Sequence, residues 1–131
     1  MKVLSTVIFG FLCFLLFAPP AVQAEASPKA AAQKSATLGD LSSFIAIARD
    51  VQKIAKEGDM VRAKSRIKEL EKSWDADEDK IRPKNPDEWG NVDKTMDQAI
   101  GKLRAGKPNK EVVLALLDSL VTKLESLNSA N

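Results

Sequence analysis

Two stretches of the chain share one spacing of apolar residues, and this spacing limits the possible folds more than any other feature. The first stretch has apolar side chains four, three and four positions apart, at Ala63, Ile67, Leu70 and Trp74. The second repeats the spacing at Val113, Leu117, Leu120 and Leu124. Residues spaced in this way line one face of an α-helix, so the chain is predicted to bury two such faces against partner helices.

Two further amphipathic stretches supply those partners. One begins near Asp40, a good N-cap, and ends at Gly58, which can adopt the positive φ of a helix C-terminus. The other has Asn85 as its N-cap and Pro86 in its first helical position. The connection from Gly58 to the next N-cap, Asp59, is short enough to force an antiparallel hairpin. We therefore predict an all-α fold, an antiparallel up-down four-helix bundle.

The two hairpins of this bundle resemble each other in sequence. Counted from the N-caps Asp59 and Asn109, the four apolar positions of the second helix in each hairpin fall at identical offsets. One interpretation is a bundle of two repeated αα-hairpins. The other is that helical periodicity alone aligns any two amphipathic helices, and the sequence leaves both open.

The N-terminus has the features of a cleavable signal peptide in residues 1–24. Lys2 precedes a mostly apolar run over residues 3–18, and Val22-Gln23-Ala24 suits a signal peptidase, which would leave the protein periplasmic or secreted. The apolar run is shorter than the roughly 20 residues that span a bilayer, so no stable membrane insertion is expected after cleavage. Residues 25–38 are then predicted to form a disordered tail, and residues 39–128 the bundle domain.

The residue types that the chain lacks exclude several chemistries. It has no His and no Tyr, and Cys13 within the signal peptide is its one cysteine. Catalysis by Ser-His-Asp or Cys-His groups, zinc bound by His or Cys, and a His-ligated haem are therefore excluded. Because no nucleotide-binding glycine motif is present either, we predict no catalytic residue and no cofactor. A formal net charge of +2 gives no reason to expect nucleic acid as a partner.

An acidic segment follows the first of the two opening stretches. Asp75, Asp77 and Asp79 match the first three ligand positions of a calcium-binding loop. Lys80 then stands where that loop requires Gly, and Pro86 stands where it requires a bidentate Glu. The sequence therefore argues against an EF-hand.

A weaker oxygen-ligand site remains as a hypothesis. Glu71, Asp75 and Glu78 are spaced four and three residues apart, which puts them on one helical face as candidate metal ligands. Lys68 and Lys72 are placed to pair with Glu71 and Asp75 at i,i+3, so the alternative is a solvated face of mixed charge.

Trp74 and Trp89 flank the Pro-containing connection between the hairpins, residues 81–86, from opposite sides. One interpretation is that the two rings stack in the core at one end of the bundle. The other is that one of them stays partly exposed and contacts a protein partner, since Trp is favoured in interfaces.

Residues 48–109 resemble an uncharacterised family of small exported bacterial four-helix proteins, and the similarity covers most of residues 40–127. The matching residues are Gly58, Asp59, Ala63, Ile67, Leu70, Glu71, Trp74, Asp75, Glu78, Pro83, Trp89, Val92, Asp93, Leu103 and Arg104. The resemblance implies a compact helical domain and no agreed activity. Some proteins of this kind carry a histidine-kinase label, which does not suit a chain without any His or nucleotide-binding motif.

From these observations we expect an exported, non-catalytic protein-binding module with an unknown protein partner in the cell envelope. One alternative is a weak carrier of metal ions or small ligands that uses the acids around Asp75. Another is an accessory or sensory component of an envelope signalling system. For any of these functions, the sequence predicts the site at the acidic end of the first opening stretch, next to Trp74.

Overall fold

The structure, a computed structural model, describes residues 36–130. The predicted signal peptide and the predicted tail up to residue 35 lie outside the described residues. The elements follow the chain as α1 (Ser42–Glu57), α2 (Met60–Ala76), α3 (Glu78–Ile81), the 3₁₀ turn η1 (Arg82–Lys84), α4 (Pro86–Leu103) and α5 (Lys110–Leu127). No helix in this part of the chain is long and apolar enough to cross a membrane.

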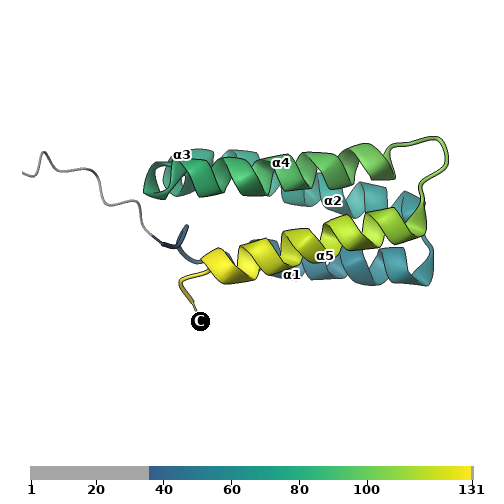
Figure 1. The fold of residues 1–131 in the computed structure, drawn as a ribbon, viewed down its shortest axis with the longest axis horizontal. Helices are drawn as coiled ribbons and strands as arrows, with labels where there is room; N and C mark the ends of the chain where they lie inside the picture. Colours follow the sequence, from purple (N-terminus) through teal and green to yellow (C-terminus); the bar gives the residue numbers. More distant parts are fainter. Residues whose placement is uncertain (1–35, 131) are drawn as a thin grey trace, which may run out of the picture. The chain divides into compact units, whose positions relative to one another are not determined.

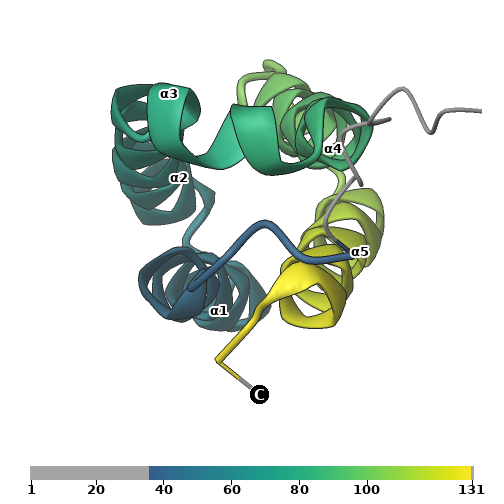
Figure 2. The ribbon, with the colours of Figure 1, turned by 90° about the vertical axis from the view of Figure 1, so that its left-hand side faces the viewer.

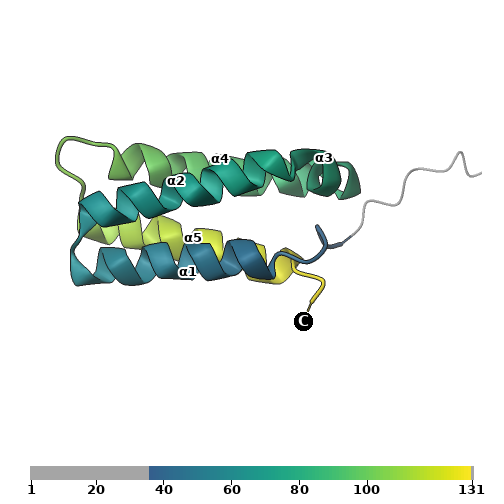
Figure 3. The ribbon, with the colours of Figure 1, turned by 180° about the vertical axis from the view of Figure 1, so that it is seen from behind.

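The fold is all-α, with four main helices packed against one another and one short helix. α1 packs on α2 and on α5, and α4 packs on α5 (Figure 1). Figure 2 shows the four helices around a common centre, with α3 passing from α2 toward α4. The α1–α2 turn and the α4–α5 loop lie together at one end, as Figure 3 shows from behind, and we call this the turn end. We call the opposite end, where α3 lies, the α3 end.

The core consists of the apolar faces that the spacing predicts. The side chains of Ala63, Ile67, Leu70 and Trp74 on α2 are fully buried, as are Val113, Leu117 and Leu120 on α5. Leu124 is 1% exposed. Apolar burial of this kind is the main stabilising contribution in a domain without disulfides, at about 25 cal/mol per Å² removed from water.

The predicted ends of the helices are confirmed at four positions. Gly58 has φ +90° and ends α1 in the left-handed conformation. The side chain of Asp59 accepts a hydrogen bond from the Arg62 N–H, and those of Asn85 and Asn109 accept from the residues three positions on. Each bond satisfies one of the backbone donors that the first turn of a helix leaves free.

The beginning of α1 differs from the prediction. The helix begins at Ser42, and Asp40 accepts from the Ser42 N–H from a position just outside the helix. Leu38, which the sequence assigns to the tail, is 1% exposed and packs in the core. The physical reason is that Leu38 is a large apolar residue whose N–H also has a partner, the Leu127 carbonyl at 2.9 Å.

The connection between α2 and α4 also differs from the prediction. Residues 78–84 form α3 and η1, where the sequence indicates a loop over residues 81–86. Ile81 is 6% exposed, so this short helix anchors itself in the core by one apolar side chain. Two i,i+3 or i,i+4 ion pairs, Lys80–Asp77 and Arg82–Glu78, lie on its outer side.

Candidate functional site

The two tryptophans stack on each other at the α3 end. The ring centroids of Trp74 and Trp89 lie 6.0 Å apart with an interplanar angle of 11°. Phe44 of α1 packs against Trp74 in an edge-to-face arrangement, with 5.4 Å between centroids. The Arg82 guanidinium lies over the Trp89 ring, 5.1 Å from its centroid. These contacts join α1, α2, α4 and η1, so the stack fixes how the elements meet at this end.

The stack determines what Trp74 and Trp89 can contact. Trp74 is fully buried, so in this structure it belongs to the core and a partner cannot reach it. Trp89 is half-buried, and Arg82 covers one face of its ring. Neither indole nitrogen has a partner that meets hydrogen-bond geometry within the described residues, although the Asp93 carboxyl lies near enough to interact with the Trp74 indole.

Two of the three candidate metal ligands, Glu71 and Glu78, pair with arginine side chains, and Asp75 forms no ion pair within the described residues. Arg104 of α4 donates to Glu71 at 3.2 Å, and Arg82 donates to Glu78 at 2.6 Å. Across residues 36–130, no group of three or more carboxylates is arranged to hold a metal ion. Glu71 therefore pairs with Arg104 of another helix. The sequence suggested Lys68, a residue of its own helix, as its partner.

Asp93 of α4 lies near these acids and has a raised pKa. Burial contributes most to the rise, followed by the negative charges of Asp97, Asp75 and Glu78, while an interaction with the Trp74 indole opposes it. The carboxyl groups of α2, α3 and α4 therefore repel one another on one side of the α3 end. The sequence shows one part of this cluster, the i,i+4 spacing of Asp93 and Asp97 within α4. It does not show that carboxyl groups of α2 and α3 lie beside them.

A second candidate region lies at the turn end and was missed from the sequence. Val61, in the first turn of α2, is 79% exposed. It lines a hollow of about 180 Å³, together with Met60, Lys64, Leu103, Ala105, Gly106 and Pro108. We call Met60, Val61, Ala105 and Pro108 the turn-end patch. An apolar side chain exposed to this degree beside a mostly apolar hollow is a feature of interaction surfaces.

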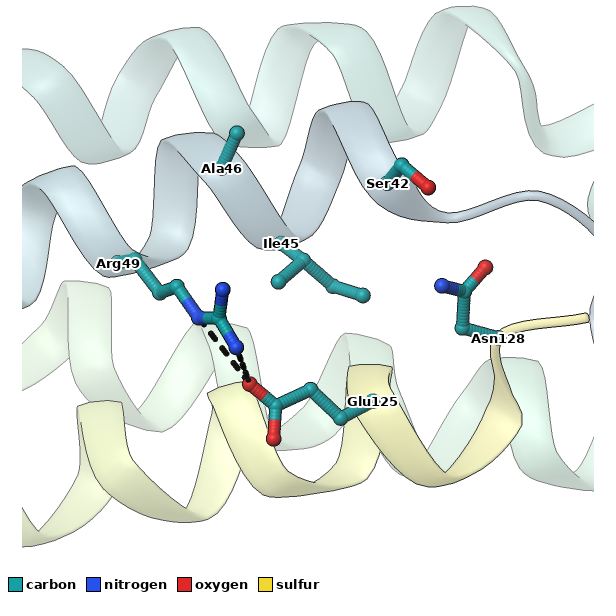
Figure 4. A pocket seen from close by; sticks show the side chains of 6 residues that line it. All are labelled: Ser42, Ile45, Ala46, Arg49, Glu125 and Asn128. Atoms are coloured by element: carbon teal, nitrogen blue, oxygen red, sulfur yellow. Dashed lines mark hydrogen bonds and ion pairs between the residues drawn. The ribbon is translucent and has the colours of Figure 1, made fainter. Parts of the chain in front are cut away.

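A larger hollow, of about 330 Å³, lies between α1 and α5 (Figure 4). Its lining is Ser42, Ile45, Ala46, Arg49, Glu125 and Asn128. Arg49 pairs with Glu125 at 2.5 Å, with the two side chains 63% and 37% exposed. A pair this exposed contributes about 0–1 kcal/mol, and the open hollow around it indicates no particular ligand.

Comparisons with known proteins identify no relative. The chain matches no protein-family model, and neither the curated proteins nor the solved structures contain a significant match. The resemblance to exported bacterial four-helix proteins therefore stays a prediction.

Proposed function

We propose that this protein is an exported, non-catalytic binding module whose turn-end patch contacts another protein of the cell envelope. The observation that supports this most is the 79% exposure of Val61 beside the apolar hollow. Lys64 lines the same hollow, and Arg62 and Lys107 adjoin the patch in the chain, against one acidic neighbour, Asp59. An apolar contact with a basic surrounding fits an acidic segment of the partner.

The same proposal includes the finer organisation of the fold, an antiparallel up-down bundle of two repeated αα-hairpins. The capping side chains of Asp59 and Asn109 each accept from the backbone N–H three residues on. From each cap, the buried positions +4, +8, +11 and +15 coincide in α2 and α5. In this organisation the α1–α2 turn and the α4–α5 loop are equivalent, and both contribute to the turn-end patch.

Photocrosslinking from the patch tests the binding proposal. A photoreactive amino acid at Val61, in the full chain expressed in its native cells, is expected to capture a distinct envelope protein. The matched control places the same group at Ser119, an exposed position of α5. With the photoreactive group at Ala105, another exposed residue of the patch, a Val61→Asp change should abolish recovery of the partner without unfolding the bundle. Capture of the same proteins from Val61 and Ser119 would contradict the proposal.

The carrier alternative has less support because arginine side chains already pair with Glu71 and Glu78. It predicts heat on calorimetric titration with calcium, iron or manganese, and an Asp75→Asn change should remove that heat. The accessory role in envelope signalling is a special case of partner binding. For it, the protein crosslinked from Val61 would be a membrane-bound receptor or kinase.

A further inference from the structure

α2 and α4 together present a face whose charge changes sign along its length. Helical spacing assigns to it Lys64, Lys68, Glu71 and Asp75 from α2, and Asp93, Asp97, Gly101 and Arg104 from α4. We call this the α2–α4 face. Two observations show that the α2 residues and the α4 residues of this face are neighbours. Arg104 pairs with Glu71 at 3.2 Å, and the negative charge of Asp75 contributes to the raised pKa of Asp93.

The two halves of the α2–α4 face carry opposite charge. Lys64 lines the hollow at the turn end, and Lys68 follows it one helical turn along α2, which makes this half basic. Asp75 and Asp93 make the half toward the α3 end acidic, and Asp97, one helical turn after Asp93 on α4, extends the acidic charge to the middle of the face. The order of charge is therefore basic to acidic in the direction from the turn end to the α3 end.

Most of these charges lack an opposite charge within the bundle. Lys64, Lys68, Asp75 and Asp97 form no ion pair with any residue in 36–130. Asp93 lies among like charges, which together with burial raise its pKa. In the lone bundle these side chains are thus solvated by water and remain able to pair with charges on another molecule.

We propose that a second copy of this chain covers the α2–α4 face in antiparallel orientation, so that the basic half of each copy lies on the acidic half of the other. A partner of one charge sign would match one half and repel the other. An antiparallel copy matches both halves, and a two-fold axis forms every contact twice. The inference does not depend on the proposed envelope partner, because it requires no other protein.

Gly101 fits this arrangement. It lies inside α4, is exposed, and has no atom within 4 Å of the position that a Cβ would occupy. Gly within a helix is destabilising by roughly 0.5–1 kcal/mol relative to Ala, so a surface Gly here needs a reason. The absence of a side chain lets a facing helix approach closely at this point of the face.

Sedimentation equilibrium of the purified protein tests the association. At low salt we expect a monomer–dimer equilibrium. Raising the salt to about 0.5 M should weaken dimerisation by about tenfold or more, because exposed charges are then screened over a few ångströms. A protein that stays monomeric at low salt, or that forms open-ended oligomers, would overturn the two-fold arrangement.

Charge reversal tests the geometry. Lys64→Glu with Lys68→Glu leaves Arg104 as the one basic residue of the face, and Asp75→Lys with Asp97→Lys leaves Glu71 and Asp93 as its acidic residues. Each double variant alone should be monomeric. An equimolar mixture of the two should form a heterodimer, because the substituted residues of each chain then face opposite charges on the other chain. A mixture that remains monomeric overturns the proposal, provided that circular dichroism shows both variants folded.

A matched control carries the same change of net charge at the same end of the bundle. Lys53→Glu with Lys56→Glu alters exposed residues of α1, outside the α2–α4 face. This variant should dimerise as the parent does. If it loses dimerisation to the same degree as Lys64→Glu with Lys68→Glu, the effect is one of net charge, and the assigned face is wrong. Because Lys64 also lines the hollow beside Val61, the proposed function is read out separately by crosslinking from Val61 in the parent and in the Lys53→Glu, Lys56→Glu control.

Discussion

Asn128 connects the two ends of the described chain. Its side-chain Oδ1 accepts a hydrogen bond of 2.8 Å from the Leu41 N–H, at the first turn of α1. The helix thus receives part of its cap from a residue 87 positions away, in addition to the local cap from Asp40. Ser129 donates to the Gly39 carbonyl at 2.9 Å beside it. These bonds hold the end of α5 against the beginning of α1.

An Asn128→Ala change tests this cap. It leaves the part-buried Leu41 N–H without its acceptor, so we expect the free energy of unfolding to fall by about 0.5–2 kcal/mol, as for other N-cap losses. Urea denaturation followed by circular dichroism measures the change. Asn128→Asp is the control, because its carboxylate keeps the acceptor near a helix N-terminus and should retain the stability.

Asp93 gives a prediction about pH. Its pKa is raised in the folded state, so the folded state binds more protons than the unfolded state between the two pKa values. The contribution of Asp93 to stability therefore decreases as the pH rises through this interval and is fully unfavourable above the folded pKa. Asp93→Asn should stabilise the protein at pH 7, and the gain should disappear below the ordinary Asp pKa. Urea denaturation at a series of pH values measures it. A gain that persists at low pH would show that the charge is not its cause.

At the scale of the helices, the ends are set by local chemistry that the sequence displays. Gly58, Asp59, Asn85 and Asn109 each act where the sequence places them, because a left-handed Gly or a capping side chain works within a few residues. The start of α1 was misplaced because its cap comes partly from Asn128, at a distance that no local pattern reveals.

A pair of identical substitutions with opposite expected effects tests the role of two glycines. Gly58→Ala places a Cβ at φ +90°, which destabilises by about 1–2 kcal/mol. Gly101→Ala lies in a helix interior with open space around the new methyl group, and should stabilise the monomer by about 0.5–1 kcal/mol. Urea denaturation at high salt, where self-association is screened, measures both. A Gly58→Ala protein as stable as the parent would contradict the strain assigned to that position, and a destabilised Gly101→Ala protein would contradict the open space at Gly101.

The candidate sites were harder to predict than the helices. The stack of Trp74 on Trp89 was foreseen as one of two possibilities, since both residues flank the same connection. The exposure of Val61 was not predicted, because the sequence does not distinguish an exposed Val from a buried one until the positions of the neighbouring helices are known. The same holds for Asp93, whose environment depends on carboxyl groups from α2 and α3.

At the scale of the whole described molecule, positive and negative charges balance but are unevenly distributed. Residues 36–130 carry seventeen basic and seventeen acidic side chains. The halves of the helices nearer the turn end, residues 50–68 and 95–118, hold ten of the basic and six of the acidic ones. A domain of zero net charge has little long-range repulsion between copies, which favours association through complementary surfaces.

The two ends of the bundle chain also meet, and this makes the order of the helices testable. The Leu38 N–H bonds to the Leu127 carbonyl at 2.9 Å, so the beginning of α1 and the end of α5 are neighbours. A circular permutant that joins Ser129 to Thr37 by a short Gly-Ser linker, with new termini between Gly106 and Lys107, keeps every helix intact. Because the new termini lie in an exposed loop, we expect a helical circular dichroism spectrum and cooperative urea unfolding like those of the parent.

The matched control for this permutant uses the same linker and moves the new termini into α5. Opening the chain between Leu117 and Asp118 divides a helix whose face includes the fully buried Leu117 and Leu120. Helices of about half that length are marginal on their own, so this variant should lose cooperative unfolding. If both permutants unfold alike, or if the loop permutant fails to fold, then the end of α5 does not pack against the beginning of α1. Retention of the fold by the loop permutant alone would establish that the packing of α1 on α5, and not the connection order of the chain, specifies the bundle.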